Sequence, residues 1–306
     1  MSDLANKEFE HEKISEVTEK FPIIDISELA KKLHSLSVVV SGSKGCGKSN
    51  LIKVLCSEFL KSDDICLQIF DTSLSWIEDF RELPIEFVAE HIEFDSYVNK
   101  SILYDIEFSD LDDITFIIRE ILLDNYNYRR DLKLQSLFNT KPIEKPKFNY
   151  YAICEEAQNI IGTYALAEKR NKLLLKIISD SRNLDIFLCF IAQRLSDVSA
   201  RAIERTNAYF IGHTIGDNDL IKLRRILGKH KLAKEVLEHI PKLKVGEFFF
   251  FDGTEIYFVK VPKYQPKAKP LTECLNKKIP AYTIPINTSQ RLTDTIQSIQ
   301  SMKGKP

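Results

Sequence analysis

The sequence predicts an α/β protein in which a mostly parallel β-sheet is flanked by helices. Apolar stretches of strand length alternate along the chain with segments of helical spacing, which is the pattern of parallel strands connected through helices. The strand at 38–41 runs into a glycine-rich loop, and two later strands end in Glu155–Glu156 and in Gln193. Because ligands bind at the carboxyl ends of parallel strands, these three positions predict one shared site.

The individual elements follow from the spacing of apolar residues. A short helix at 27–33 precedes the first strand, and the glycine loop opens a helix that ends near residue 62. Further strands are expected at 65–71, 101–106, 148–154, 185–193 and 208–214. Helices are expected at 110–132, 165–181, 196–205, 217–227, 232–239 and 292–302. The segment 246–261 is predicted to form a hairpin with an Asp-Gly turn.

Composition and charge divide the chain into three predicted parts. Residues 1–35 are predicted to form an N-terminal arm, 36–261 the α/β domain, and 262–306, which is rich in Pro and Lys, a C-terminal linker or tail. An acidic insert is expected at about 76–106. The net charge is −1, but bases dominate between residues 222 and 269, which permits a local nucleic-acid surface as well as an ordinary solvated helix face.

The overall composition is that of a soluble globular protein. Of the 306 residues, 44% are hydrophobic and 28% are charged. No apolar stretch approaches the roughly 18 residues that cross a bilayer, and the amino end lacks the features of a signal peptide, so we expect a cytoplasmic protein without a membrane span. The six cysteines contain no C-x-x-C pair, so neither a zinc site nor a disulfide framework is expected.

The glycine-rich loop fits the P-loop spacing G-x-x-x-x-G-K-[ST], which predicts binding of ATP. The residues expected to surround the phosphates are Gly42, Ser43, Lys44, Gly45, Cys46, Gly47, Lys48, Ser49 and Asn50. Glycines let successive N–H groups turn toward a phosphate chain, and the following helix adds the positive end of its dipole. Lys48 is expected to reach the β- and γ-phosphates, and the Ser49 hydroxyl to hold Mg²⁺.

Two carboxylates and one amide supply the remaining chemistry. Glu155 is predicted to hold the hydration shell of Mg²⁺, and Glu156 to orient and polarise the attacking water. Gln193 is predicted to hydrogen-bond the γ-phosphate or that water. Phosphoryl transfer needs mainly positioning and charge neutralisation, so this set favours ATP hydrolysis.

Two stretches of the chain also match longer motifs. Glu155-Glu156-Ala157-Gln158 is similar to a Walker B signature of the form D-E-A-H/Q. An S-R-N-like turn at Ser181-Arg182-Asn183 leads through a strand to a Q-R-x-S-D-like end at 193–197. With the Walker A P-loop, these motifs resemble the HerA–FtsK superfamily of DNA-pumping ATPases, and the match covers about 36–261 in order.

This resemblance implies a RecA-like P-loop NTPase core, a homo-oligomer that is expected to be a hexamer, and ATP-driven movement along double-stranded DNA. It implies that Gln193 acts as the sensor and that Arg182 is an arginine finger that reaches a neighbouring subunit's nucleotide. Two alternatives stay open. Arg182 can instead cap its own helix, and Arg194, Arg201 and Arg205 are rival fingers or DNA contacts.

The sequence departs from the superfamily pattern in two places. Glu155 stands where Asp is usual, and only about 35 residues precede the P-loop strand, which leaves no room there for the barrel domain of HerA proteins. The chain is therefore more similar to compact viral genome-packaging ATPases or small plasmid-transfer ATPases. A viral protein of this kind would act in the host cytoplasm, with capsid or transfer machinery as its partner.

The leading hypothesis is a hydrolase that couples ATP hydrolysis to translocation of double-stranded DNA. Its candidate contacts to DNA phosphates are Arg129, Arg130, Lys133 and the basic stretch 222–244. One alternative is a nucleotide-dependent switch or scaffold that does not translocate DNA. Another is a P-loop kinase, although no acceptor-site signature is evident and the Glu-Glu and Gln arrangement favours water as the acceptor.

Overall fold

The structure, a computed structural model, describes residues 20–71, 76, 80, 86–88, 101–105, 111–138, 148–163 and 172–265. The helix predicted at 292–302 and much of the predicted insert at 76–106 lie outside these residues. All described residues belong to one compact unit, which ends at Pro266.

Strands and helices alternate through most of the described residues. The strands are β1 (Val38–Ser41), β2 (Ile65–Asp71), β3 (Glu86–Val88), β4 (Ile102–Asp105), β5 (Asn149–Cys154), β6 (Ile186–Ala192), β7 (Ala208–Ile211), β8 (Glu247–Phe251) and β9 (Ile256–Lys260). The helices are α2 (Ile26–Leu33), α3 (Lys48–Phe59), α5 (Leu111–Phe138), α6 (Gln158–Ile161), α7 (Lys172–Leu184), α8 (Ala200–Ile203), α9 (Asp217–Leu227) and α10 (Ala233–His239), with 3-10 turns η4 (Leu195–Asp197) and η5 (Ile240–Lys242). Within the described part of the chain, no helix is long and apolar enough to cross a membrane.

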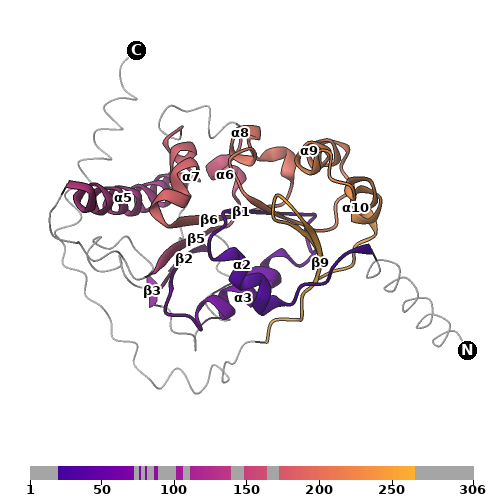
Figure 1. Cartoon of the computed structure of the whole chain (residues 1–306), viewed down its shortest axis with the longest axis horizontal. Helices are drawn as coiled ribbons and strands as arrows, with labels where there is room; N and C mark the ends of the chain where they lie inside the picture. Colours follow the sequence, from indigo (N-terminus) through magenta and orange to yellow (C-terminus); the bar gives the residue numbers. More distant parts are fainter. Residues whose placement is uncertain are drawn as a thin grey trace, which may run out of the picture. The chain divides into compact units, whose positions relative to one another are not determined.

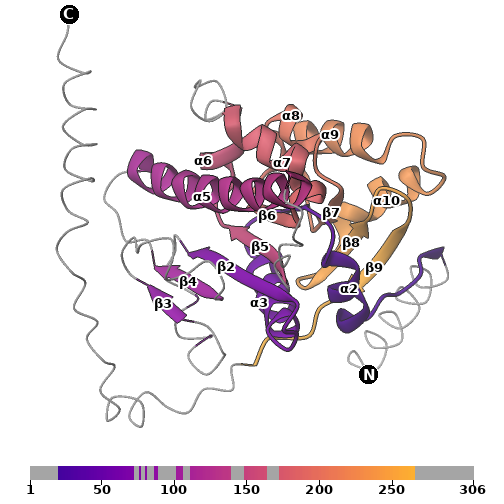
Figure 2. The same ribbon diagram turned by 60° about the vertical axis from the view of Figure 1, so that its left-hand side comes forward.

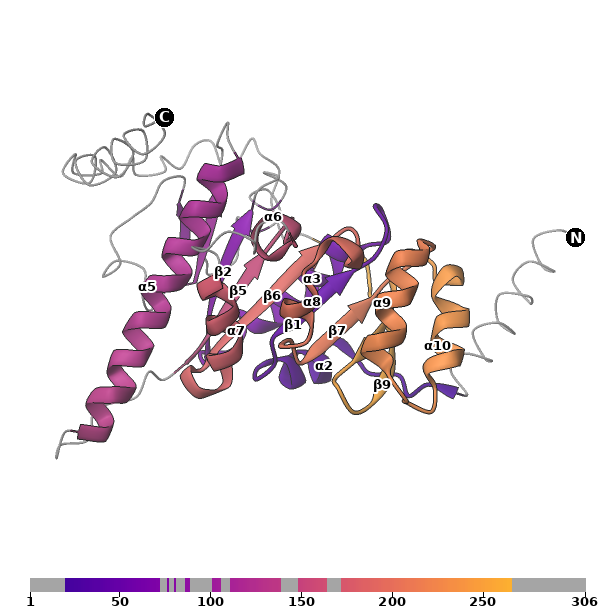
Figure 3. The same cartoon turned by 90° about the horizontal axis from the view of Figure 1, so that it is seen from above.

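These strands form one sheet in the order β3-β4-β2-β5-β6-β1-β7-β8-β9 (Figures 1 and 3). Neighbouring strands are parallel from β3 to β7, and β8 and β9 join antiparallel at the other edge. In β1, Val40 pairs with Ile191 of β6 and with Phe210 of β7. The predicted α/β class with a mostly parallel sheet is confirmed.

Helices cover both faces of the sheet (Figures 1 and 2). The helices α2 and α3 lie on one face, and α5, α7, α8 and α9 lie on the other. Strand side chains alternate between the two layers, as a period of two requires. In β1, Val38 and Val40 pack in the core that contains α2 and α3, whereas Val39 packs in the core that contains α5 and α7. Burial on both faces explains why the strands are apolar without interruption.

The chain contributes to the core from Phe21 onward. The helix α2 begins after Asp25, whose carboxylate accepts a 2.8 Å hydrogen bond from the backbone N–H of Glu28. Phe21 is 1% exposed, and its ring lies 4.8 Å from that of Phe249 in β8. The predicted division of the chain at residues 35 and 261 stays a prediction.

The helix predicted at 196–205 is wrong, because the segment is broken between η4 and α8. There Val198 forms an isolated β-bridge with Gly162, and the N–H of Ser199 donates to the carbonyl of Ile161 at 2.9 Å. These tertiary contacts hold the backbone extended at a point where local spacing favours a helix.

Candidate functional site

The strand order brings three strand ends to one place. Because β6 lies between β1 and β5, Gln193 directly after β6 lies between the glycine loop and Glu155–Glu156. The three segments line one cleft of about 300 Å³. Its lining residues are Lys44, Gly45, Gly47, Lys48, Ser49, Asn50, Glu155, Glu156, Ile191, Ala192 and Gln193. The other predicted loop residues, Gly42, Ser43 and Cys46, belong to the same loop without lining the cleft.

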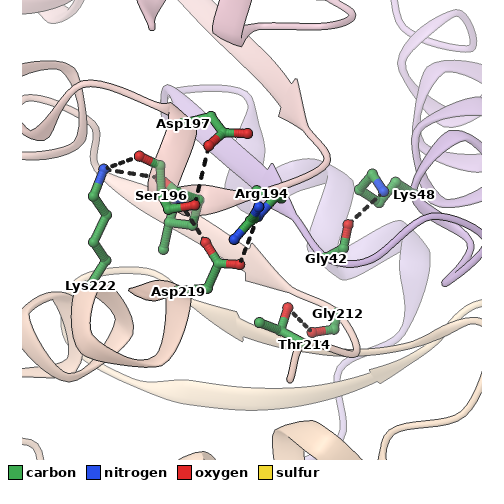
Figure 4. Close-up of polar contacts among 10 residues, drawn as sticks. Gly42, Lys48, Arg194, Ser196, Asp197, Gly212, Thr214, Asp219 and Lys222 are labelled. Carbon is green, nitrogen blue, oxygen red and sulfur yellow. Dashed lines mark hydrogen bonds and ion pairs between the residues drawn. The ribbon is translucent and has the colours of Figure 1, made fainter. Parts of the chain in front are cut away.

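Lys48 is the first residue of α3, and its side chain folds back onto the loop (Figure 4). Its Nζ donates to the carbonyl of Gly42 at 2.7 Å and to that of Ser43 at 3.1 Å. Burial lowers the pKa of Lys48, and nearby Cys46, Glu156 and Glu155 oppose that effect. An ammonium at the start of a helix adds to the positive end of the helix dipole, so this loop is suited to bind an anion.

The loop requires glycine at position 47. Gly47 has a φ of +101°, and a Cβ there would lie 3.0 Å from the backbone nitrogen of Gly246. That nitrogen donates to the carbonyl of Cys46 at 2.9 Å, so the P-loop is supported by the segment that leads into β8. A side chain at position 47 would combine backbone strain with a clash against another backbone.

Two further contacts tie the P-loop region to distant segments. Ser43 N–H donates to the carbonyl of His213 at 2.8 Å, and Ser43 Oγ lies 2.9 Å from Nδ1 of the same histidine. On the helix side, Asn50 Nδ2 donates to the carbonyl of Pro262 at 2.9 Å, and Tyr264 N–H donates to Asn50 Oδ1 at 2.7 Å. The sequence carries no motif that points to His213, so sequence analysis missed this contact.

Both carboxylate oxygens of Glu156 accept hydrogen bonds from glutamine amides. Oε1 accepts from Nε2 of Gln193 at 3.0 Å, and Oε2 accepts from Nε2 of Gln158. Glu156 also has a φ of +46°, in the left-handed region that residues other than glycine seldom adopt and that is common at functional sites. The sequence motif at 155–158 includes Gln158 but does not indicate a role for its side chain.

Ser49 and Glu155 have the chemistry that a Mg²⁺ ion needs. Glu155 is 7% exposed, and both residues line the cleft, where they present hydroxyl and carboxylate oxygens. Among the residues that the structure describes, no group of three or more His, Cys, Asp or Glu side chains could hold a metal. The two residues therefore fit a hard cation that takes its other ligands from phosphate and water.

Comparison with known proteins rests on solved structures, because no protein-family model and no curated protein matches the sequence. The genome-packaging NTPase B204 from Sulfolobus turreted icosahedral virus 2, in complex with ATP-gammaS, has a TM-score of 0.52 and 19% identity over 77% of this chain and 99% of that chain. The DNA-packaging ATPase B204 from Sulfolobus turreted icosahedral virus has a TM-score of 0.50 and 18% identity, over 76% and 98% of the two chains. This chain has the fold of B204. The likeness to B204 shows a P-loop NTPase fold with a RecA-like core, and the roles of individual residues stay predictions.

In this B204-like fold, Arg182 lies at the amino-terminal end of β6, whereas the cleft lies at the carboxyl-terminal ends of the strands. Arg182 belongs to the last turn of α7, just before β6, whereas the cleft lies after β6. A strand of 7 residues spans about 23 Å, which is farther than an arginine side chain extends. The exposed Arg182 therefore does not line the cleft of its own chain.

Two of the other predicted arginine fingers have partners within the chain. Arg194 Nε lies 3.8 Å from Oδ2 of Asp219, and Arg205 Nη1 donates to the carbonyl of Leu175 at 2.9 Å. Arg201 is exposed.

Two of the candidate DNA contacts, Arg129 and Lys222, do not fit that role, because Arg129 is buried and the half-buried Lys222 bonds to carbonyls of this chain. Arg129 is 5% exposed, donates to the carbonyl of Phe148 at 3.0 Å, and lies 5.2 Å from the centre of that ring. Lys222 donates to three backbone carbonyls of the turn after β6. The exposed bases of the predicted stretch are Arg224, Arg225, Lys229, Lys231, Lys234, Lys242 and Lys244.

Proposed function

We propose that this chain hydrolyses ATP with Mg²⁺ and couples hydrolysis to translocation of double-stranded DNA, in viral genome packaging or plasmid DNA transfer. The observation that carries the proposal is the single cleft lined by the P-loop, Glu155–Glu156 and Gln193. A phosphate-binding loop facing carboxylates and an amide across about 300 Å³ is the arrangement that hydrolysis of a phosphoanhydride needs.

The chain's own residues divide the work as follows. The loop N–H groups and Lys48 bind the phosphates, and Ser49 and Glu155 hold Mg²⁺, which supplies charge neutralisation when bound. Glu156 orients the attacking water and accepts its proton, and Gln193 turns from Glu156 toward the γ-phosphate. The 3.0 Å bond between Gln193 and Glu156 supports these two roles, because it shows that both side chains reach the same part of the cleft.

Three further features support the coupling to DNA in an assembly. B204 is described as a DNA-packaging ATPase. Exposed bases are concentrated on α9, α10 and the adjoining turns, where DNA phosphates can be bound without regard to sequence. The position of Arg182, away from its own cleft, is compatible with a finger supplied to a neighbour, so we propose a homo-oligomer, with six subunits as the expected number. Its place of action would be the cytoplasm, with capsid or transfer machinery as the docking partner.

Steady-state ATPase rates with and without duplex DNA test this function. We expect release of inorganic phosphate that duplex DNA stimulates, that Lys48→Ala abolishes, and that Glu156→Gln reduces by about 10²-fold or more. Nucleotide binding by Glu156→Gln is expected to persist, because that change leaves the P-loop intact. Full activity in both variants would overturn the assignment of the cleft, and phosphate transfer to an acceptor other than water would favour a kinase.

A nucleotide-dependent switch or scaffold is the second candidate, and one observation favours it. Each oxygen of Glu156 accepts a hydrogen bond from an amide, and these amides compete with an attacking water for the carboxylate. A switch of this kind binds ATP tightly and turns over slowly, whether or not DNA is present. Single-turnover hydrolysis measured together with particle mass separates the candidates: a motor hydrolyses faster on DNA, whereas a switch changes its assembly state on nucleotide binding alone.

A further inference from the structure

The turn that follows Gln193 is held by the first turns of α9 (Figure 4). Lys222 Nζ donates to the carbonyls of Leu195 at 3.2 Å, Ser196 at 2.8 Å and Val198 at 2.6 Å. A lysine ammonium has three donors, so these three carbonyls use all of them. Such a contact fixes the path of the backbone directly behind Gln193.

Asp219 also holds this turn, through the backbone N–H of Ser196 and the side chain of Arg194. Its Oδ1 accepts from the backbone N–H of Ser196 at 2.6 Å, and its Oδ2 lies 3.8 Å from Nε of Arg194. Asp219 is 5% exposed, so this carboxylate is buried, whereas Ser196 is half-buried and Arg194 is exposed. Asp219 and Lys222 are three positions apart on α9 and therefore point from one face of the helix to one turn (Figure 4).

The pKa of Lys222 reflects both its burial and the charges near it. Burial lowers the pKa of Lys222, while the nearby carboxylates of Asp219 and Asp197 raise it. Nearby Arg225 adds to the lowering of the pKa of Lys222, so the charges of Asp219 and Asp197 offset it only in part. An unpaired charge there would be costly, so neither residue is an incidental surface charge.

The start of α9 is also connected to the P-loop. The segment between β7 and α9 carries His213, which contacts Ser43 twice, and Thr214, whose hydroxyl donates to the carbonyl of Gly212 at 3.3 Å (Figure 4). The segment that leads into α9 is therefore bonded to the P-loop, and α9 itself is bonded to the turn after Gln193.

We propose that Asp219 and Lys222 are positioning residues for the hydrolysis proposed above, and that they act by fixing the turn behind Gln193. The pair holds the backbone behind Gln193, so that the amide stays within reach of Glu156 and of the cleft. This inference rests on the proposed function.

The test is a kinetic comparison of Asp219→Ala and Lys222→Met with wild type, in the absence of DNA. Misplacement of a reacting group by about 1 Å can cost 10²-fold, so we expect kcat to fall about tenfold or more. We expect KM for ATP and the dissociation constant of ATP-gammaS to stay within about twofold, because neither residue lines the cleft. Asp217→Asn is the matched control, since it removes an exposed carboxylate from the same helix turn and should keep wild-type kcat.

A double-mutant cycle with Gln193→Ala distinguishes positioning from general damage. If the pair acts through Gln193, adding Asp219→Ala to Gln193→Ala lowers kcat little further. The inference is overturned if the fold losses in kcat from Asp219→Ala and Gln193→Ala multiply in the double variant. It is also overturned if Asp219→Ala and Lys222→Met both keep the wild-type kcat. Asp219→Asn, which keeps an acceptor for the Ser196 N–H, is the milder variant if Asp219→Ala does not fold, and it is expected to recover part of the rate.

The outcomes for the inference and for the proposed function differ. The inference alone is overturned if the wild type hydrolyses ATP, Lys48→Ala does not, and Asp219→Ala and Lys222→Met keep the wild-type kcat. Wild-type turnover that is absent, or that survives Lys48→Ala, overturns the proposed function and the inference with it.

Discussion

The side-chain amide of Gln193 donates a 3.0 Å hydrogen bond to Oε1 of Glu156, although 37 positions separate the two residues in sequence. The bond exists because β6 lies beside β5, which brings the residues after both strands to the same edge of the sheet. A second amide, from Gln158, occupies the other oxygen. The carboxylate is thereby held in one orientation from two sides.

Gln158→Ala tests the value of that orientation. The change removes the donor to Oε2 of Glu156 and leaves the P-loop untouched, so we expect kcat for ATP hydrolysis to fall about tenfold with KM nearly constant. Gln158→Glu is the informative partner variant, because it replaces the donor with a like charge and should lower kcat further. A wild-type kcat in Gln158→Ala would mean that Gln193 alone orients Glu156.

Arg182→Ala tests whether a cation is supplied between subunits. Because Arg182 lies at the opposite end of β6 from its own cleft, we expect inactive Arg182→Ala subunits to lower the ATPase rate of wild-type subunits when the two are mixed. Nucleotide binding by the variant alone should be normal. Arg201→Ala, which changes another exposed arginine, is the matched comparison. A rate that follows only the fraction of wild-type subunits would exclude Arg182 as the finger.

Arg129→Ala is expected to cost stability. Its guanidinium is buried, bonded to the carbonyl of Phe148 and placed over that ring, so its removal should lower the free energy of unfolding by roughly 2–4 kcal/mol. Denaturant titration measures this. Arg130→Ala is the control, because its 3.3 Å pair with Asp131 is solvent-exposed and is worth about 0.5 kcal/mol. Equal stability of the two variants would contradict the structural assignment of Arg129.

Cys46 is expected to resist alkylation despite its place in the P-loop. The thiol is 3% exposed, and burial raises its pKa, so little thiolate exists near pH 7. We expect iodoacetamide to label Cys46 slowly in the native protein at pH 7 and readily after denaturation, as measured by mass spectrometry of peptides. Labelling should accelerate as the pH rises toward that raised pKa. Rapid native labelling at pH 7 would indicate that the loop opens.

The fold class and the members of the cleft could be predicted from sequence because both depend on local patterns. Uninterrupted apolar strands indicate a sheet buried on both faces. The polar residues after Val40, Cys154 and Ala192 mark the carboxyl ends of three strands, where ligands bind in parallel sheets. The strand order that puts Gln193 in the middle depends on contacts between distant segments, which spacing along the chain does not record.

The errors have the same origin. Arg129 and Lys222 are candidates for DNA contact by sequence because they lie among other bases. Composition does not distinguish a base in solvent from one whose donors are bonded to carbonyls of the same chain, as those of Arg129 and Lys222 are. The helix predicted at 196–205 fails where Val198 pairs with Gly162, a contact between segments 36 positions apart. His213 was missed because its bonds to Ser43 form only when β7 lies beside β1.

The amide of Asn50 is satisfied at both ends by backbone beyond the last strand, at Pro262 and Tyr264. A shortened protein that stops at Lys260, where β9 ends, would leave that amide without either partner at the first turn of α3. Any truncation intended to isolate the α/β domain should therefore retain the chain through Tyr264.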